Sequence, residues 1–138
     1  MEILILNGPN LNLVGERNKK HYGSESLTDF FDAIQQTNFN LTVLQSNNEG
    51  ELIDILQTSN VDAIIFNAGG YTHTSVALRD AVEAISTPVV EVHISNIAAR
   101  ESFRHNSLLT PVAVGCIFGF GLKGYLLAID YVLKYLKD

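Results

Sequence analysis

Short apolar runs alternate with longer amphipathic segments along the whole chain. The runs are rich in Ile, Val and Leu and are bounded by Gly, Pro, Asn or Asp, a pattern typical of buried strands. Strands are predicted over residues 2–7, 41–45, 62–67, 89–94 and 112–118. The segments between them predict helices over about 27–38, 49–58 and 74–85, and a last helix that opens at Gly119-Phe120-Gly121 and runs to about Leu136. Ser26 followed by Asp29 resembles a capping box at the start of the first helix.

Strands that are apolar throughout and separated by helices indicate a parallel sheet covered on both faces. We therefore expect a single α/β domain over residues 1–138, with a three-layer flavodoxin-like fold and a five-stranded parallel sheet in the order 2-1-3-4-5. In such folds a ligand binds outside the carboxyl ends of the strands, at the topological switch point between the first and third strands. The candidate chemistry should therefore be sought at that rim.

Polar side chains collect at the predicted strand ends. The set consists of Asn7, Asn10, Asn12, Asn67, His73, Glu91, His93, Ser95 and Asn96. Taken one at a time, an Asn before a turn is usually a structural cap, and Asn7 and Asn12 are interpreted in this way. As a group on the rim where these folds bind ligands, the residues indicate a functional site.

Two features of this rim have specific chemical interpretations. Glu91 and His93 are two residues apart on a strand, so they share one face, and the carboxylate can fix the tautomer of the imidazole. Gly69-Gly70 precedes a predicted helix, whose free N–H groups would suit an anion. The alternatives are a structural histidine in the first case and a plain turn in the second, with Thr72 or Thr74 capping the helix.

Composition narrows the classes of partner. The net charge of −6 argues against a nucleic-acid or anionic-membrane surface, and no apolar stretch approaches the roughly 18 residues of a membrane span. The single cysteine, Cys116, lies in an apolar run and is interpreted as a packing residue rather than a nucleophile. The four histidines lack ligand-like spacing with carboxylates, so we expect no metal. With one cysteine, no apparent secretory signal and no membrane span, we expect a cytoplasmic protein. Arg100 and Arg104 belong to a long loop, 95–111, that should face the same rim.

Several motifs, in order and spacing along nearly the whole chain, are shared with one enzyme family. They are Asn7-Gly8-Pro9-Asn10-Leu11-Asn12-Leu13, Arg17 with Tyr22-Gly23, Asn67-Ala68-Gly69-Gly70-Tyr71-Thr72-His73, Glu91-Val92-His93-Ile94-Ser95-Asn96, and Gly119-Phe120-Gly121 with Gly124-Tyr125. In these motifs the chain resembles the type II 3-dehydroquinate dehydratases. The resemblance implies a hydro-lyase that converts 3-dehydroquinate to 3-dehydroshikimate, in the shikimate route to chorismate and aromatic amino acids, without a cofactor.

The resemblance also implies roles in an anti elimination through an enolate. Tyr22 is the base that takes the C2 proton, Arg17 stabilises its tyrosinate form, and Asn10 holds the enolate through a water. His93 protonates the departing C1 hydroxyl, and Glu91 orients His93. These residue types agree with the reaction, since a proton beside a ketone needs a base, an enolate stabiliser and an acid for the leaving group.

The implied substrate-binding residues are Asn67, Ile94 and Ser95 for the carboxylate, His73 and Arg104 for the ring hydroxyls, and Asp80 from a neighbouring subunit. The family is expected to assemble as a dodecamer, a tetramer of trimers. The helix pattern agrees with a role for Asp80 outside its own subunit. The predicted core stripe is formed by Ala77, Ala81, Val82 and Ile85, so Asp80 and Glu83 should face away from their own sheet.

The competing class is a binding or signalling module on the same fold. A response-regulator receiver would need carboxylates at the ends of the first and third strands, where this chain has Asn7 and Asn67. A flavodoxin would need a Ser- and Thr-rich phosphate loop after the first strand, where the chain has Gly8-Pro9-Asn10-Leu11-Asn12. Both comparisons favour the enzyme.

Overall fold

The computed structural model describes residues 1–16 and 25–136, which include a five-stranded sheet. The strands are β1 (Glu2–Asn7), β2 (Asn40–Gln45), β3 (Ala63–Asn67), β4 (Val89–His93) and β5 (Gly115–Phe118). All neighbours run parallel, in the order β2-β1-β3-β4-β5. The predicted flavodoxin-like fold and its strand order are therefore confirmed.

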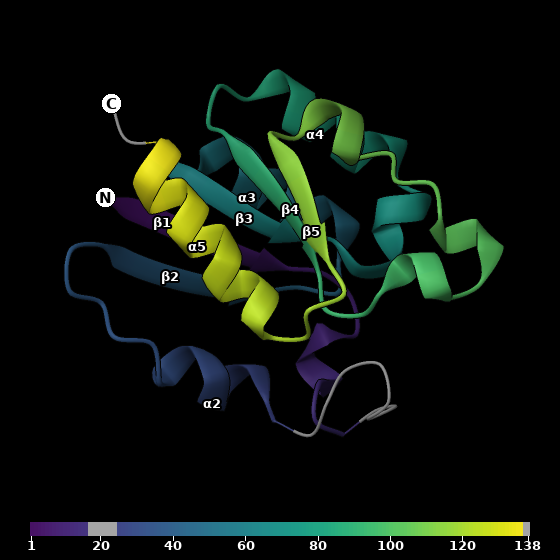
Figure 1. The fold of residues 1–138 in the computed structure, drawn as a ribbon. Helices are drawn as coiled ribbons and strands as arrows, with labels where there is room; N and C mark the ends of the chain where they lie inside the picture. Colours follow the sequence, from purple (N-terminus) through teal and green to yellow (C-terminus); the bar gives the residue numbers. More distant parts are fainter. Residues whose placement is uncertain (17–24, 137–138) are drawn as a thin grey trace.

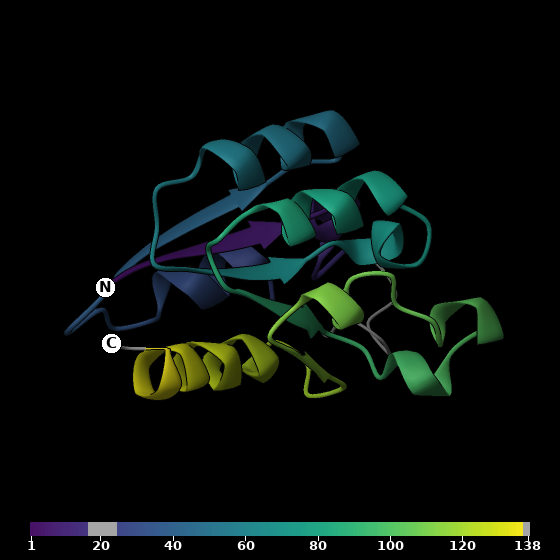
Figure 2. The same ribbon diagram turned by 90° about the horizontal axis from the view of Figure 1, so that it is seen from above.

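Helices cover both faces of the sheet (Figures 1 and 2). They are α2 (Leu27–Asp32), α3 (Glu49–Thr58), α4 (Val76–Ala84) and α5 (Lys123–Tyr135). α3 and α4 pack side by side on one face, and α2 and α5 lie on the other. Along β1 the side chains alternate between two cores, with Ile3 and Ile5 on the α5 side and Leu4 and Leu6 on the α3 side. This alternation explains why the strand is apolar at each position from Ile3 to Leu6.

The covering is incomplete at the β2 edge. Most of β2 is exposed, including Val43 and Leu44, which are 37% and 40% exposed. The apolar pattern of this strand predicted burial on both faces, and this chain alone does not bury it. The apolar pattern cannot distinguish a central strand from an edge strand.

Three helices differ in their bounds from the predictions. α5 begins at Lys123, after the Gly119-Phe120-Gly121 segment that was predicted to open it. α2 is capped by Ser26, whose Oγ accepts from the Asp29 backbone N–H, as predicted, but it ends at Asp32 rather than near 38. In the segment that follows, the Gln36 side chain accepts from the Leu41 backbone N–H, so it supports the start of β2 instead. α4 begins at Val76 rather than Thr74, because Ser75 is its cap and accepts from the Leu78 N–H. The predicted caps Thr72 and Thr74 were therefore wrong.

Short 3-10 helices lie in the loops that follow the carboxyl ends of β1, β3 and β4 (Figure 2). They are η1 (Leu11–Leu13), η2 (Gly69–His73), η3 (Ile97–Ala99) and η4 (Ser102–Arg104), whereas η5 (Thr110–Val112) comes just before the amino end of β5. The turns after β1 and β3 touch each other at Gly8, where a Cβ atom would lie 2.6 Å from the Ala68 carbonyl oxygen. Only glycine permits this approach, which brings Asn10 next to η2.

None of the helices within the described residues is long and apolar enough to cross a membrane.

Candidate active site

A polar pocket of about 150 Å³ opens at the carboxyl ends of β1, β3 and β4. Seven of the predicted site residues line it: Asn10, Asn67, His73, His93, Ile94, Ser95 and Arg104. Arg100, from the same loop as Arg104, also lines it. The structure thus brings together residues that are up to 94 positions apart in the sequence, from Asn10 to Arg104.

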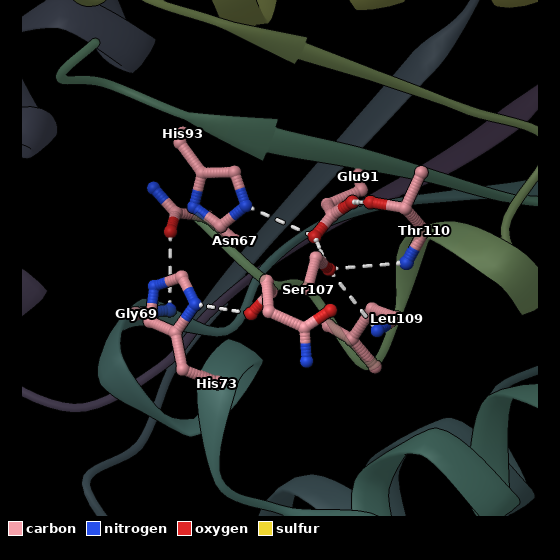
Figure 3. Close-up of polar contacts among 9 residues, drawn as sticks. Asn67, Gly69, His73, Glu91, His93, Ser107, Leu109 and Thr110 are labelled. Carbon is pink, nitrogen blue, oxygen red and sulfur yellow. Dashed lines mark hydrogen bonds and ion pairs between the residues drawn. The ribbon is translucent and has the colours of Figure 1, made fainter. Parts of the chain in front are cut away.

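His93, on the wall of the pocket, forms a buried pair with the carboxylate of Glu91 (Figure 3). Both side chains come from β4, where their spacing of two places them on one face, as predicted. His93 Nε2 lies 3.0 Å from Glu91 Oε1. His93 is 5% exposed and Glu91 only 1%, so water screens their interaction weakly.

Glu91 also receives two hydroxyl hydrogen bonds from the loop before β5 (Figure 3). Ser107 Oγ donates to Glu91 Oε1, and Thr110 Oγ1 donates to Glu91 Oε2. Burial by itself would raise the pKa of Glu91, but the hydrogen bonds from His93, Ser107 and Thr110 outweigh it and lower the pKa to about 2. Glu91 is therefore a carboxylate at neutral pH.

His73 lies beside this pair, on η2. Its ring and that of His93 stack with centroids 6.3 Å apart and planes inclined by 20°. His73 Nδ1 lies 2.8 Å from the Asn106 carbonyl oxygen, which can only accept, so Nδ1 carries the hydrogen. Partial burial, together with the nearby His93 and Arg104, lowers the pKa of His73. A neutral His73 therefore has Nε2 available as an acceptor.

A buried tyrosine fixes Asn67 from below the pocket. Tyr125, on α5, donates its hydroxyl to Asn7 Oδ1 at 2.6 Å and accepts from Asn67 Nδ2 at 2.9 Å. Asn67 Oδ1 in turn accepts from the Gly69 N–H at 3.2 Å (Figure 3). Asn7 thus has the structural role that its position before a turn indicated, while Asn67 has one amide hydrogen beyond its bond to Tyr125.

The remaining lining residues come from the loops. Asn10 adopts the left-handed conformation (φ 68°), which Asn tolerates better than most residues, and its backbone N–H donates to Asn47 Oδ1. Arg100 donates to Ser95 Oγ at 3.2 Å. Arg104 is paired with Glu101 and lies over the Phe103 ring. The pocket thus combines two imidazoles with two guanidinium groups, which suits a polar anionic ligand.

One predicted site residue, Asp80, lies away from this pocket. Asp80 is on the exposed face of α4, paired with Arg79 at 2.8 Å, and does not line this pocket. As predicted, Asp80 and Glu83 face away from the sheet, although the buried stripe contains Leu78 in place of Ala77. Arg17 and Tyr22 lie outside the described residues.

A separate cavity of about 590 Å³ lies between α2 and β2. It is lined by Asn7, Asn12 and mainly apolar or uncharged side chains, and it contains neither the histidines nor the arginines described above. Most of the polar residues expected at one rim are therefore divided between this cavity and the polar pocket. The polar pocket has the imidazoles, which can donate and accept protons.

One cluster near the pocket could in principle ligate a metal. Ligand atoms of Glu91, His93 and Cys116 lie within 4.8 Å of one another. Both Glu91 oxygens already accept hydrogen bonds, and burial and the Glu91 charge raise the pKa of the Cys116 thiol to about 12. A protonated thiol is a poor metal ligand. We therefore interpret the cluster as the hydrogen-bonded Glu91–His93 pair with Cys116 packed beside it.

The sequence interpretation missed three residues of this site. Tyr125 stands in one of the motifs quoted above, but its place inside a helix gave no indication of a polar role. Ser107 and Thr110 are common residue types in a loop, with no spacing relative to Glu91 that would identify them. Their contacts depend on the path of the loop.

Comparisons with known proteins agree on one family. The family model for dehydroquinase class II matches residues 1–133. A 3-dehydroquinate dehydratase of Prochlorococcus marinus (strain NATL1A) is 49% identical, with 99% of each chain covered. One from Bacillus pumilus (strain SAFR-032) is 52% identical, over 95% of this chain and 93% of the relative. The crystal structure of a type II dehydroquinase from Butyrivibrio crossotus DSM 2876 superposes with a TM-score of 0.91 at 44% identity, covering 97% of this chain and 98% of that one.

A match that extends over nearly the full chain, at close to half identity and with the same fold, identifies the family without relying on any single motif. The chain belongs to the dehydroquinase class II family of enzymes.

Proposed function

We propose that this enzyme dehydrates 3-dehydroquinate to 3-dehydroshikimate, a step of the shikimate pathway, by anti elimination through an enolate. The observation that carries the proposal is the buried His93–Glu91 pair, which opens into a pocket with amide, imidazole and guanidinium groups. An elimination of water needs an acid for the departing hydroxyl, and a histidine backed by a carboxylate can serve as that acid. The full-length dehydratase relatives support the same substrate.

His93 is the proposed acid. Because Glu91 is an acceptor, His93 Nε2 holds its hydrogen in that bond, and Nδ1 is left to face the substrate. Glu91 stabilises the protonated ring, and Nδ1–H then delivers its proton to the leaving C1 hydroxyl, which departs as water.

Tyr22 is the proposed base for the C2 proton, with Arg17 stabilising its anion and Asn10 holding the enolate through a water. This assignment is supported by the motif resemblance for Arg17 and Tyr22 and by the position of Asn10 on the pocket wall. Free tyrosine has a pKa of about 10, so a nearby cation is needed for it to act near neutral pH. Tyr22→Phe should abolish turnover and preserve substrate binding, because the proposed carboxylate contacts lie elsewhere.

The substrate carboxylate is proposed to bind Asn67 and the strand end at Ile94 and Ser95. His73 and Arg104 contact the ring hydroxyls. The neutral His73 fits this role, since its Nε2 can accept from a hydroxyl. Asp80 is proposed to complete the site of a neighbouring subunit in a dodecamer, a tetramer of trimers, of a cytoplasmic protein. Its exposure on the outer face of α4 supports a contact beyond its own chain.

The test is to mix the purified protein with 3-dehydroquinate and follow the ultraviolet absorbance of the conjugated enone that dehydration creates. A steady rise that scales with enzyme concentration supports the proposal. His93→Gln serves as the matched preparation, and its rate should be lower by about 10²–10⁴-fold, the usual contribution of a general acid. No absorbance rise with the unmodified protein would refute the function.

A further inference from the structure

The hydroxyl of Ser107 has a single possible donor direction. The backbone N–H groups of Leu109 and Thr110 both donate to Ser107 Oγ, each at 3.1 Å. A serine hydroxyl has two acceptor positions and one hydrogen, so both acceptor positions are occupied. The hydrogen is left for Glu91 Oε1, the third contact of this oxygen (Figure 3).

The Glu91 carboxylate is surrounded by donors. Oε1 accepts from Ser107 and faces His93 Nε2, while Oε2 accepts from Thr110. Because the two hydroxyls are oriented as donors, the carboxylate has to be an acceptor toward His93 as well. Each carboxylate oxygen accepts from a residue of segment 106–110, so rotation of the Glu91 side chain is restrained.

The same loop also orients the second histidine. Asn106, the residue before Ser107, offers its carbonyl oxygen to His73 Nδ1 at 2.8 Å. Segment 106–110 therefore contacts His73 directly and His93 through Glu91 (Figure 3). Ser107 and Thr110 do not line the pocket, so they can affect the reaction only through these contacts.

We propose that Ser107 and Thr110 are positioning residues for the dehydration: by fixing the Glu91 carboxylate they hold His93 in the Nε2–H tautomer and aim Nδ1 at the leaving hydroxyl. The inference rests on the proposed function for its catalytic consequence. The tautomer that it specifies is a property of the protein without substrate. The two parts can therefore be tested separately.

The experiment uses Ser107→Ala, Thr110→Val and the double variant. Thr110→Val removes the hydroxyl and keeps the shape of the side chain, while the matched Thr110→Ser keeps the hydroxyl and removes the methyl group. Ser102→Ala, an exposed serine of the same loop, controls for changes in this region. Nitrogen NMR of histidine-labelled protein, with the His93 signal assigned from His93→Gln, reports the tautomer of the neutral ring. Steady-state kinetics give kcat and KM.

We expect kcat to fall by about 10-fold in Ser107→Ala and in Thr110→Val, by analogy with groups that orient metal-ligating histidines. KM should stay within about twofold, because neither side chain contacts the substrate. The His93 signal should shift from the Nε2–H form toward a mixture of tautomers, most strongly in the double variant. Thr110→Ser should return the His93 spectrum to the unmodified pattern.

An unchanged His93 tautomer in the double variant would overturn the proposal. A rise in KM at constant kcat would also overturn it, because it would show that the two side chains only pack the loop and do not position His93. If Ser107→Ala fails to fold, the comparison of Thr110→Val with Thr110→Ser decides the question. If the unmodified protein does not dehydrate 3-dehydroquinate, the proposed function fails, while the NMR result still decides the role of the two hydroxyls.

Discussion

At the scale of single residues, Glu91 keeps a charge inside the protein. Its side chain is 1% exposed, and an ion in that position is stable only when hydrogen bonds replace its lost water. Three donors do so: a ring nitrogen and two hydroxyls. Removal of the Glu91 charge should therefore lower the stability of the protein as well as its turnover.

Glu91→Gln should lower the free energy of unfolding in a pH-dependent manner. The folded pKa of about 2 lies below the ordinary 4.5, so the charge contributes stability above pH 4.5 and loses it as the pH falls toward 2. The shift corresponds to about 3 kcal/mol at neutral pH. Urea unfolding of both proteins at about pH 7 and about pH 3 should show a difference that narrows in acid. A difference of equal size at both values would contradict the assignment.

Tyr125→Phe should destabilise the protein by about 1–3 kcal/mol, because Asn7 Oδ1 and Asn67 Nδ2 each lose a buried partner. Phenylalanine keeps the ring that packs edge-on to Phe31, with centroids 5.0 Å apart, so the change isolates the hydroxyl. Urea midpoints measure the effect. Tyr135→Phe, at a side chain that is 69% exposed, is the control and should change stability by less than about 0.5 kcal/mol. Equal midpoints for the two variants would show that the network contributes nothing.

The sequence predicted the part of the site that local geometry determines. Glu91 and His93 share a face because side chains alternate along a strand, so their pairing could be inferred from spacing alone. Ser107 and Thr110 are 16 and 19 residues from Glu91, across a loop whose path no periodicity describes. Tyr125 is 118 residues from Asn7, and only the packing of α5 on the sheet brings them together.

At the scale of elements, the first four strands were predicted to within one residue at each end, but β5 begins at Gly115 rather than Val112, because Thr110–Val112 form η5. β1 and α3 begin and end at the predicted residues. The turn at Gly69-Gly70 was predicted to lead into a helix from about Thr74, but Gly69–His73 form η2 and α4 begins at Val76. A 3-10 turn and the first turn of an α-helix share residue preferences, so the local pattern did not separate them.

Ser75→Ala should destabilise the protein by about 1 kcal/mol, the usual cost of losing an N-cap side chain. Ser75 is buried, and its Oγ accepts from the Leu78 N–H at 2.9 Å. The exposed Ser86, beyond the end of α4, provides the control variant Ser86→Ala. Thermal unfolding of both variants should separate them. If Ser86→Ala costs as much as Ser75→Ala, Ser75 does not act as the cap.

At the scale of the whole molecule, the strand order follows from general rules for alternating strands and helices, and it was predicted correctly. Which surfaces are covered could not be predicted in this way. Besides the β2 edge, the outer face of α5 exposes Leu126, Leu127 and Tyr131. These apolar side chains support the proposal that the chain buries further surface against other copies of itself.

The proposed oligomer predicts complementation between two impaired variants. Asp80→Ala lacks the group given to a neighbour, and His93→Gln lacks the acid of its own site. A mixed oligomer contains sites with an intact His93 and a neighbour's intact Asp80, so subunit exchange should restore activity above the sum of the separate variants. Light scattering should find about twelve chains, the number in the proposed tetramer of trimers. A fully active monomer, or mixtures with only additive activity, would contradict a role across an interface.

If the pocket at the ends of β3 and β4 dehydrates 3-dehydroquinate with His93 as the acid, the loss of His93 should slow the chemical step itself. The most direct measurement is the pre-steady-state rate of enone formation in the unmodified protein and in His93→Gln, at substrate concentrations that saturate both. We expect rapid enone formation in the unmodified protein and a rate lower by about 10²–10⁴-fold in the variant, with substrate still bound. Enone formation at a similar rate in both proteins would contradict this role of His93.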